Sequence, residues 1–492
     1  MVRSLARWVV FAAGSVLLGL VLIALALYWH FVRSGPEPRP WHQAVLADFT
    51  AADAGEVTDL AGYVQLEDRL FAELLDKVYA GSEPADRIPF NRFSAGSRSD
   101  PGIWPVNWNR TYHLEPAPDA GERRGAALLL HGLTDSPYSL RSVGEHLASS
   151  GFEVVGLRLP GHGTAPSGLL KFRVEDMQAA VRLAMLDLRR QVGPDEPIYI
   201  AGYSNGAALA VDYTLSVLDG EALPMPAGLV LVSPAIAISR FAALARTRTG
   251  LSSVPGFERA AWQVIETEFD PYKYNSFSFN AAGETYRLTT RVTRQVERQA
   301  AGQPIRGFPP VLAFLSTVDS TVLADAVVDA LLEHLAPEGH ELVLFDVNRY
   351  ATVQPLLVRD PGPLTQRLLS MPTRPFGLTV ITNATPETLQ VKELRAAAGS
   401  GEQVTRLLDL AWPRTVFSLS HVALPFPPDD PLYGYETLAD AAHVQLGRIE
   451  VRGENGVLAL PTWALTRQRS NPFHSYLIER LDGFVGSDDA QP

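Results

Sequence analysis

The sequence predicts an α/β fold with a mostly parallel central sheet and helices on both of its faces. From residue 110 onward, short apolar runs alternate with stretches of helical periodicity. This alternation is typical of right-handed β–α–β units, which build parallel sheets. A second observation is the stretch IAGYSNGAALA at residues 200–210, where Ser204 lies between Gly202 and Gly206 at the end of an apolar run. We expect a strand, a tight turn and a helix there.

The individual elements follow from length and periodicity. Short unbroken apolar runs indicate buried strands at residues 126–132, 152–160, 197–204, 228–235, 311–319 and 340–347. Longer periodic stretches indicate helices at residues 138–151, 174–193, 205–218 and 323–337. Two of these helices end at a glycine, Gly151 or Gly193, which is a common helix stop signal. The core therefore occupies residues 110–239 and 308–492.

Two stretches interrupt this alternation. Residues 240–307 contain many aromatics and amphipathic pieces, and we expect them to form an inserted, mostly helical cap. Residues 348–414 are a second insertion with an apolar run of their own, FGLTVIT at 376–382. The pattern assigns no structure to this second insertion.

The N-terminus predicts a membrane anchor over residues 1–33. Residues 8–32 contain no Asp, Glu, Lys or Arg, and about 20 apolar residues are enough for a helix to cross a bilayer. Trp8 lies at one end, and Tyr28 and Trp29 lie at the other, as is common for aromatics at membrane interfaces. A cleaved signal peptide is the alternative, but its apolar region is usually shorter. We expect a bacterial inner-membrane protein with its large domain outside the cytoplasm.

Residues 34–109 form a linker and an N-terminal extension. Residues 34–40, SGPEPRP, predict a stiff extended spacer, and residues 63–79 predict a helix with leucines on one face. The net charge of −12 argues against a nucleic-acid binder, which needs a basic surface. The chain has no cysteine, so disulfides, thiolate metal sites and a cysteine nucleophile are excluded. No metal and no organic cofactor are implied.

Ser204 is the predicted nucleophile. A serine on a tight turn between a strand and a helix presents its hydroxyl above the carboxyl ends of the sheet, where ligands bind in open α/β sheets. Gly202 and Gly206 are expected because side chains at these positions would collide with the backbone. A turn serine with a purely structural role is the alternative, but the strand-to-helix context favours catalysis.

The serine needs a base, and the base needs an orienting acid. Asp319 ends the strand after next, so it is the predicted acid, with helix capping as the alternative role. His421 is the predicted base because RTVFSLSHVALPF suggests an apolar strand that ends at this histidine. His474 is the second candidate.

Backbone N–H groups of Leu133 and Asn205 are the predicted oxyanion hole. Asn205 directly follows the nucleophile at a helix N-terminus, and Leu133 lies in the turn HGLTDSP after the first buried strand. His131 in that turn precedes Ser204 in the chain, so we expect it to be a structural hydrogen-bonding residue.

Four stretches together resemble the α/β-hydrolase superfamily, and within it the bacterial carboxylesterases and monoacylglycerol-lipase-like serine hydrolases. They are LLLHGLTDSPYSLRSVGEHLASSGFEVVGLRLPGHGTAPSG, AGYSNGAALA, STVDSTV and SLSHVALPF. The resemblance covers residues 110–347 and His421. It implies triad roles for Ser204, Asp319 and His421 and oxyanion roles for Leu133 and Asn205. Tyr203 and Asn205 stand where His and Met or Leu are commoner in that branch.

Three functions are compatible with these residues. The first is a membrane-anchored serine esterase or lipase that cleaves small or lipid-like acyl esters through an acyl-enzyme. In it, the cap aromatics would line an acyl site, unless they are cap core; they are Trp262, Phe269, Tyr272, Tyr274, Phe277 and Phe279. The second is a serine peptidase or amidase, in which Glu266, Glu268 and Asp270 could hold a substrate amine. The third is a hydrolase-fold scaffold without activity.

Overall fold

The computed structural model describes most of the chain. The described residues are 2–29, 36–236, 258–319, 321–351, 362–371, 373–414, 416–436, 442–447 and 468–486.

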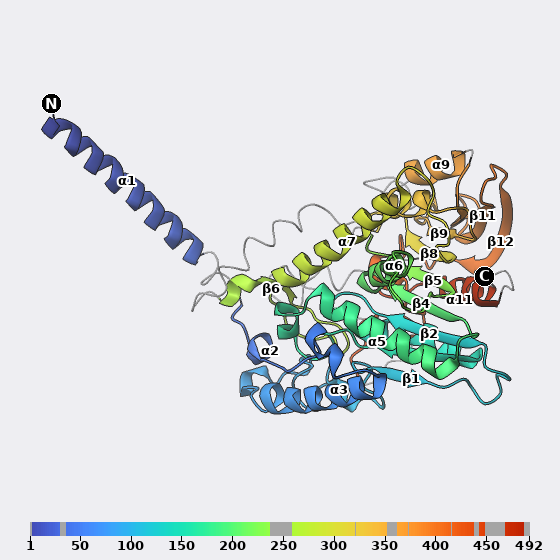
Figure 1. Cartoon of the computed structure of the whole chain (residues 1–492), viewed down its shortest axis with the longest axis horizontal. Coiled ribbons are helices and arrows are strands. Elements are labelled where there is room, and N and C mark those ends of the chain that lie inside the picture. The colour runs from blue at the N-terminus through green and yellow to red at the C-terminus, as the bar shows by residue number, and fades with distance from the viewer. Residues whose placement is uncertain are drawn as a thin grey trace.

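A ten-stranded sheet forms the centre of the molecule (Figure 1). Its strands, in spatial order, are β1 (Tyr112–Leu114), β3 (Phe152–Leu157), β2 (Gly125–Leu130), β4 (Ile198–Tyr203), β5 (Gly228–Val232), β8 (Val311–Ser316), β9 (Glu341–Phe345), β10 (Gly377–Asn383), β11 (Gln390–Ala396) and β12 (Val404–Ala411). The strands from β3 to β10 are parallel to one another, whereas β1, β11 and β12 each pair in an antiparallel way. The predicted mostly parallel sheet is confirmed.

Helices cover both faces of the sheet, also as predicted. On β2, Ala126, Leu128 and Leu130 belong to one buried cluster, and the alternate residues Ala127 and Leu129 belong to another. The first cluster includes side chains from α5 (Val174–Val192), α6 (Asn205–Leu218), α7 (Phe279–Ala300) and α8 (Ala324–Ala330). The second includes side chains from α4 (Arg141–Ser149) and α11 (His474–Gly486). Because side chains alternate along a strand, each central strand contributes to both cores.

The second insertion extends the sheet. The run FGLTVIT forms β10, which is parallel to β9, and β11 and β12 follow it as an antiparallel hairpin. Helix α9 (Gly362–Ser370) precedes β10 and buries Leu368 in the first core. β10 is largely buried, whereas β12 at the end of the sheet is largely exposed.

One predicted strand is absent. Residues 416–420 lie outside any strand, and His421 is the first residue of a short 3-10 helix, His421–Ala423. Instead of entering the sheet, this segment crosses the ends of two strands. The backbone N–H of Asn348 donates to the Phe417 carbonyl at 2.9 Å, and Ser316 Oγ donates to the Leu419 carbonyl at 2.8 Å. These bonds bring the chain from the far end of the sheet back to the end of β8.

The cap range contains less separate structure than expected. Within residues 258–278 there is a short 3-10 helix, Glu258–Ala261, and a small antiparallel pair formed by β6 (Trp262–Val264) and β7 (Phe277–Ser278). The long helix α7 is helical as predicted, but it packs on the main core through Leu288, Val292 and Val296. We call residues 258–278 the cap segment; residues 240–257 of the predicted cap lie outside the described residues.

The N-terminal extension packs against the core, whereas helix α1 (Val2–Tyr28) lies apart from it (Figure 1). Within the part of the chain that the structure describes, no helix meets the length and apolarity needed to cross a membrane. Helix α2 (Pro40–Gln43) and helix α3 (Leu60–Leu74) belong to the extension, and α3 is capped by Asp59, whose side chain accepts from the Gly62 N–H. A π-helical turn, Leu75–Tyr79, continues α3 over the rest of the predicted helix.

Candidate active site

Ser204 lies on a strained turn between β4 and α6. Its backbone has φ 54° and ψ −113°, a conformation that residues other than glycine rarely adopt. The turn is fixed by two hydrogen bonds, from Ser204 N–H to the Val232 carbonyl at 2.9 Å and from Ala235 N–H to the Ser204 carbonyl at 3.1 Å. Such strain costs about 1–3 kcal/mol and persists only where the surroundings impose it. The predicted strand, turn and helix are therefore present, and Ser204 is at the carboxyl end of a central strand.

Both glycines around Ser204 are needed for this turn. A Cβ on Gly202 would lie 2.5 Å from the Cα of Ala207, which is backbone. A Cβ on Gly206 would lie 2.6 Å from the His131 carbonyl oxygen and even closer to that of Leu130. Because these neighbours are main-chain atoms, they cannot move aside as a flexible side chain could. The glycines let α6 start directly against the ends of β2 and β4.

Asp319 and His421 form a buried pair. His421 Nδ1 and Asp319 Oδ2 are 2.7 Å apart, although 102 residues separate them in the chain. The other carboxylate oxygen, Oδ1, accepts from the backbone N–H groups of Thr321 at 2.8 Å and Val322 at 2.9 Å. Burial opposes ionisation of Asp319, but the hydrogen bond and charge interaction with His421 and these two donors outweigh it. The pKa of Asp319 therefore lies below its ordinary value.

Ser204 is connected to this pair through its neighbour. Tyr203 Oη donates to the His421 carbonyl at 3.4 Å, and the two rings lie 5.3 Å apart. Among the described residues, the Ser204 hydroxyl makes no hydrogen bond of its own. Catalytic hydrogen bonds are often long in substrate-free structures and tighten when substrate binds. The structure thus brings the predicted acid and base together and joins them to Tyr203, the residue before the predicted nucleophile.

The two predicted oxyanion donors lie beside Ser204 in the fold. Asn205 is the first residue of α6, so its N–H has no partner within the helix. Leu133 follows β2, the strand next to β4, and precedes Thr134, whose φ of 68° makes the turn sharp. Neither N–H donates to a described residue outside its own element. Both groups remain available to a developing negative charge.

A family model described as "Serine aminopeptidase, S33" matches residues 121–348, which contain Ser204 and Asp319 together with the parallel strands that carry them. Over these residues the match confirms the predicted resemblance to the α/β-hydrolase superfamily. A thermostable monoacylglycerol lipase from Bacillus sp. (strain H-257) is 30% identical over 130 residues, which are 26% of this chain and 47% of that protein. The chain thus spans about half the length of this curated relative.

Solved structures of other proteins align with about half of this chain. A monoacylglycerol lipase from Paleococcus ferrophilus aligns with 48% of this chain and 88% of its own, at 20% identity and a TM-score of 0.36. A structure from work on the metagenome-derived lipolytic enzymes LipS and LipT aligns with 48% of this chain and 87% of its own, at 20% identity and a TM-score of 0.39.

Two other histidines considered in the sequence, His131 and His474, are buried and have hydrogen-bond partners. His131 Nε2 accepts from the Leu159 N–H at 3.0 Å, and its Nδ1 lies 2.9 Å from the Gly132 carbonyl, so both ring nitrogens are engaged. Burial lowers the pKa of His131 well below its ordinary value, so the ring is neutral. His474, the second candidate base, starts α11, and its Nε2 lies 3.1 Å from Ser142 Oγ. Burial lowers the pKa of His474 to about 4.

Two contacts to the turn that carries Leu133 were not evident from the sequence. Lys273 Nζ lies 2.8 Å from Asp135 Oδ1, and the Tyr274 N–H donates to the Thr134 carbonyl at 2.8 Å. Both come from the cap segment. No motif connects residues this far apart, so sequence reasoning had no signal for them.

Two of the three acids predicted to hold a substrate amine, Glu268 and Asp270, are buried in the cap segment. Glu268 is fully buried and accepts from the N–H groups of Asn275 and Ser276, each at 2.9 Å. Asp270 is also fully buried and accepts from Tyr433 Oη at 2.7 Å. Both carboxylates are therefore structural, and neither is presented to a substrate amine.

The cap aromatics are mainly packing residues. Tyr272 stacks on Tyr138 with ring centroids 4.4 Å apart, and Phe269 belongs to the same buried cluster. Trp262 packs edge-on against His42, and Tyr274 belongs to the main core. The cap aromatics were expected either to line an acyl site or to form the core of the cap. These four side chains are packed in the core.

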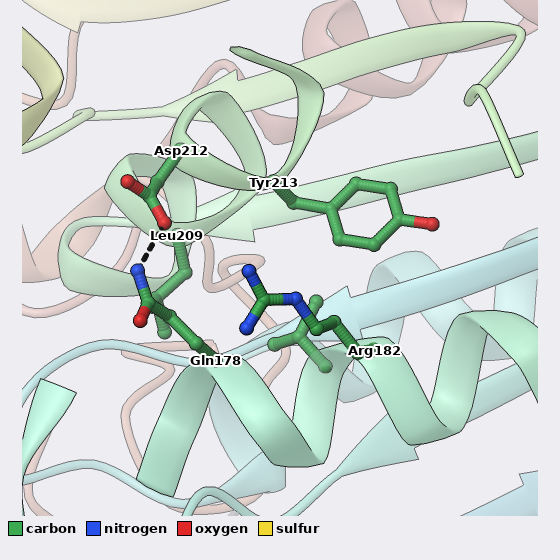
Figure 2. A pocket seen from close by; sticks show the side chains of 6 residues that line it. Gln178, Arg182, Leu209, Asp212 and Tyr213 are labelled. Carbon is green, nitrogen blue, oxygen red and sulfur yellow. Dashed lines mark hydrogen bonds between the residues drawn. The ribbon is translucent and has the colours of Figure 1, made fainter. Parts of the chain in front are cut away.

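A small hollow lies between α5 and α6 (Figure 2). It is lined by Gln178, Val181, Arg182, Leu209, Asp212 and Tyr213. Asp212 is eight residues after Ser204 on α6, or about 12 Å along the helix axis. Two polar residues that line the hollow are hydrogen-bonded to each other, because Gln178 Nε2 donates to Asp212 Oδ2 at 2.5 Å. Within the described ranges, no cluster of three or more His, Asp or Glu side chains could hold a metal ion.

Proposed function

We propose that this α/β-hydrolase is a serine hydrolase that cleaves carboxylic esters through an acyl-enzyme. The observation that carries the proposal is the buried Asp319–His421 pair, which contacts Tyr203, the residue before Ser204 on its strained turn. A hydroxyl on such a turn, next to an imidazole oriented by a carboxylate, suits nucleophilic attack on a carbonyl.

In the first step, Ser204 Oγ attacks the acyl carbonyl while His421 Nε2 takes its proton. The N–H groups of Leu133 and Asn205 stabilise the oxyanion, and each such donor is worth roughly 3 kcal/mol. The tetrahedral intermediate collapses, the ester C–O bond breaks, and His421 gives the proton to the leaving alcohol. Water then attacks the acyl-serine by the same route, which releases the acid and restores the serine.

The substrate class follows from the relative. The Bacillus protein is named a monoacylglycerol lipase. We therefore propose an ester of a lipid-like acyl chain as the substrate. Hydrolysis of p-nitrophenyl esters with short, medium and long acyl chains tests this proposal. We expect turnover that disappears in Ser204→Ala. Turnover that is unchanged in Ser204→Ala would refute the enzymatic role and would favour a scaffold.

A peptidase or amidase is the second candidate, because the matching family model is described as a serine aminopeptidase. The triad chemistry is shared between ester and amide hydrolysis, so the fold does not separate them. Of the predicted amine-binding acids Glu266, Glu268 and Asp270, the last two have other partners, which favours the ester. Aminoacyl p-nitroanilides assayed beside the esters decide between the two: we expect ester turnover to exceed amide turnover by a large factor.

We further propose that residues 8–32 attach the enzyme to a bacterial inner membrane, with the catalytic domain outside the cytoplasm. The support is the uncharged sequence of this stretch and the exposure of its apolar side chains; Trp8 and Phe11 are each 69% exposed. Lipid would cover such side chains. A reporter active only in the periplasm, fused after Pro492, should be active, and its inactivity would overturn the orientation.

A further inference from the structure

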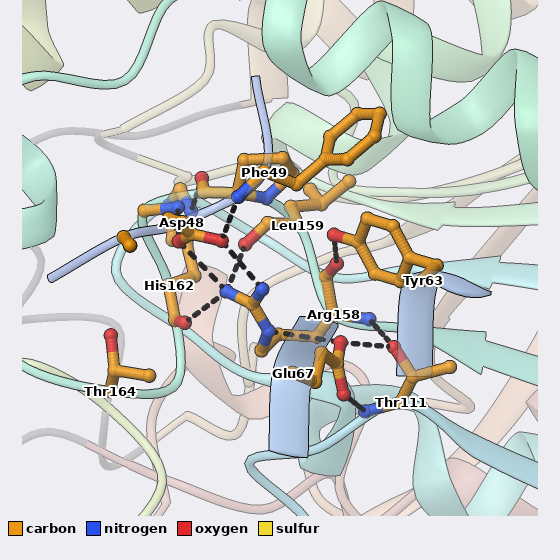
Figure 3. A network of polar contacts seen from close by, with 12 residues as sticks. Asp48, Phe49, Tyr63, Glu67, Thr111, Arg158, Leu159, His162 and Thr164 are labelled. Atoms are coloured by element: carbon orange, nitrogen blue, oxygen red, sulfur yellow. Dashed lines mark hydrogen bonds and ion pairs between the residues drawn. The ribbon is translucent and has the colours of Figure 1, made fainter. Parts of the chain in front are cut away.

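The N-terminal extension is joined to the core by a buried arginine, Arg158, which follows β3. Arg158 is fully buried and is bound on two sides by carboxylates of the extension (Figure 3). Its Nη2 and Nη1 donate to the two oxygens of Asp48 at 2.7 and 3.0 Å, and its Nε donates to Glu67 Oε1 at 2.9 Å. Such paired, bidentate contacts fix both the position and the plane of the guanidinium. Arg158 is therefore oriented by residues outside the hydrolase core.

The same residues fix the loop that follows Arg158. Asp48 Oδ2 also accepts from the Gly161 N–H at 2.7 Å, and Arg158 Nη1 donates to the His162 carbonyl at 3.0 Å. Tyr63 Oη, on α3, donates to the Arg158 carbonyl at 2.7 Å. Residues 158–163 thus owe their conformation to the extension as well as to their own sequence.

This loop in turn supports the turn that holds Leu133. The Leu159 N–H donates to His131 Nε2 at 3.0 Å, which sets the ring orientation and tautomer of His131. The His131 and His162 rings lie 5.2 Å apart. We call residues 131–136 the oxyanion turn. His131 is two residues before Leu133, so a displaced loop would displace the oxyanion turn.

The extension also holds the cap segment, which touches the oxyanion turn from the other side. The Arg92 N–H donates to the Glu268 carbonyl at 2.8 Å, and Ser99 Oγ donates to the Phe269 carbonyl at 2.7 Å. His42 Nε2 lies 2.9 Å from Ser276 Oγ. Between these points, the cap segment donates from Tyr274 N–H to the oxyanion turn. Two independent routes therefore run from the extension to this turn.

A buried ion pair is costly to form and is weak evidence for stability, but removing one partner is strongly destabilising locally because it leaves a charge without a partner. Burial raises the pKa of Glu67 above its ordinary value, against the attraction of Arg158 and the hydrogen bonds from Thr111. An apolar contact could attach the extension to the core at lower cost. The two carboxylates fix the position and the plane of the Arg158 guanidinium.

We propose that Asp48 and Glu67 are positioning residues of the active site, acting through Arg158 and residues 159–163 on the oxyanion turn. The inference rests on the proposed function for the role of that turn. The extension is then part of the catalytic apparatus, and the hydrolase core alone would have a poorly placed Leu133 N–H. Neither carboxylate touches the substrate.

The test uses the full-length chain with Glu67→Gln and Asp48→Asn, which keep side-chain shape and remove the charge. Asp68→Asn is the matched control, because Asp68 is the next residue on α3 but is exposed and pairs with Arg110 at the surface. Active serines are titrated with a fluorophosphonate, and kcat and KM for a p-nitrophenyl ester are expressed per titrated serine. Thermal unfolding records the stability of each variant.

We expect kcat per titrated serine to fall about 10-fold to 100-fold in Glu67→Gln and Asp48→Asn, with KM nearly unchanged, since the lost interaction acts in the transition state. The rate constant of fluorophosphonate labelling should fall in parallel. Asp68→Asn should match the wild type in all three quantities. A structural role alone would lower the number of titratable serines and the melting temperature, but leave kcat per serine within twofold of wild type, and that result would overturn the proposal.

Two further outcomes are distinguishable. If a charge-removing variant does not fold, Tyr63→Phe removes only the hydrogen bond to the Arg158 carbonyl, and a smaller loss of kcat per titrated serine is still expected. If the wild type cleaves no ester, the proposed function fails, but the labelling rate still tests positioning: an equal rate in wild type and Glu67→Gln overturns it.

Discussion

Replacing Asp319 by asparagine should reverse the proton arrangement of the triad. In the structure, Asp319 Oδ1 accepts two backbone N–H groups, from Thr321 and Val322, and Oδ2 faces His421 Nδ1. An asparagine keeps both backbone bonds only if its carbonyl oxygen takes the Oδ1 position. Its NH2 group then faces His421.

The alternative amide orientation would set NH2 against two backbone donors. Losing those two bonds costs about 2–4 kcal/mol, which excludes this orientation for all but roughly one molecule in thirty or fewer. With the NH2 group facing it, His421 Nδ1 must accept a hydrogen bond, so the ring proton moves to Nε2. A protonated Nε2 cannot accept the proton of the Ser204 hydroxyl. We expect kcat to fall by a factor on the order of 10⁴.

The measurement is steady-state hydrolysis of a p-nitrophenyl ester by Asp319→Asn, with Asp325→Asn as the control, because Asp325 is exposed in the first turn of the nearby α8. The pKa of Asp319 is lower in the folded protein than in the unfolded chain. Its ionised form therefore stabilises the fold at pH values above the unfolded pKa of about 4, and this stabilisation is lost as the pH falls through the folded-state pKa. The Asn variant should therefore be less stable at pH 7. A folded Asp319→Asn with kcat within tenfold of wild type would refute the role of Asp319.

Three further predictions follow from single contacts. His421→Ala should lower kcat by at least about 1,000-fold, whereas His474→Gln should leave kcat within about threefold; steady-state kinetics with both variants decides, and the reverse order would make His474 the base. Gly206→Ala should abolish fluorophosphonate labelling, because its Cβ would meet backbone oxygens, while Gly483→Ala, with open space around it, should label normally; equal labelling would contradict the tight turn. Burial raises the pKa of Glu268 to about 7, above the ordinary 4.5, so its protonated form stabilises the fold below about pH 4.5 and this contribution is lost as pH rises through 7. Urea unfolding should show that the free energy of unfolding of the wild type falls by about 3 kcal/mol relative to that of Glu268→Gln between pH 4.5 and 8. A difference between the two proteins that does not change with pH would contradict this prediction.

The central sheet and its nucleophile turn could be predicted because their signals are local. Strands β2, β3, β4 and β8 are each followed along the chain by a helix, and Gly202 avoids a clash with the backbone of Ala207, five residues later. The chain order of Ser204, Asp319 and His421 follows from the fold once the strands are assigned. The predicted strand before His421 is wrong, because this segment crosses the ends of strands and does not enter the sheet.

The remaining features depend on contacts between distant residues. The sheet continues past β9 through β10, β11 and β12. The run FGLTVIT itself does not indicate which strand it will pair with. Arg158 has charged partners more than 90 residues away, so its role was invisible in the sequence. The same holds for Glu268 and Asp270, which look like exposed acids by composition and are buried by tertiary packing.

The most direct test of the account is to trap the acyl-enzyme. The full-length protein is mixed with a slowly turned-over p-nitrophenyl ester, quenched in acid and digested, and the peptide containing Ser204 is weighed by mass spectrometry. This peptide should gain the mass of the acyl group, and the gain should be absent in Ser204→Ala. Ester turnover with no acyl group on Ser204, or an acyl group on another residue, would contradict it.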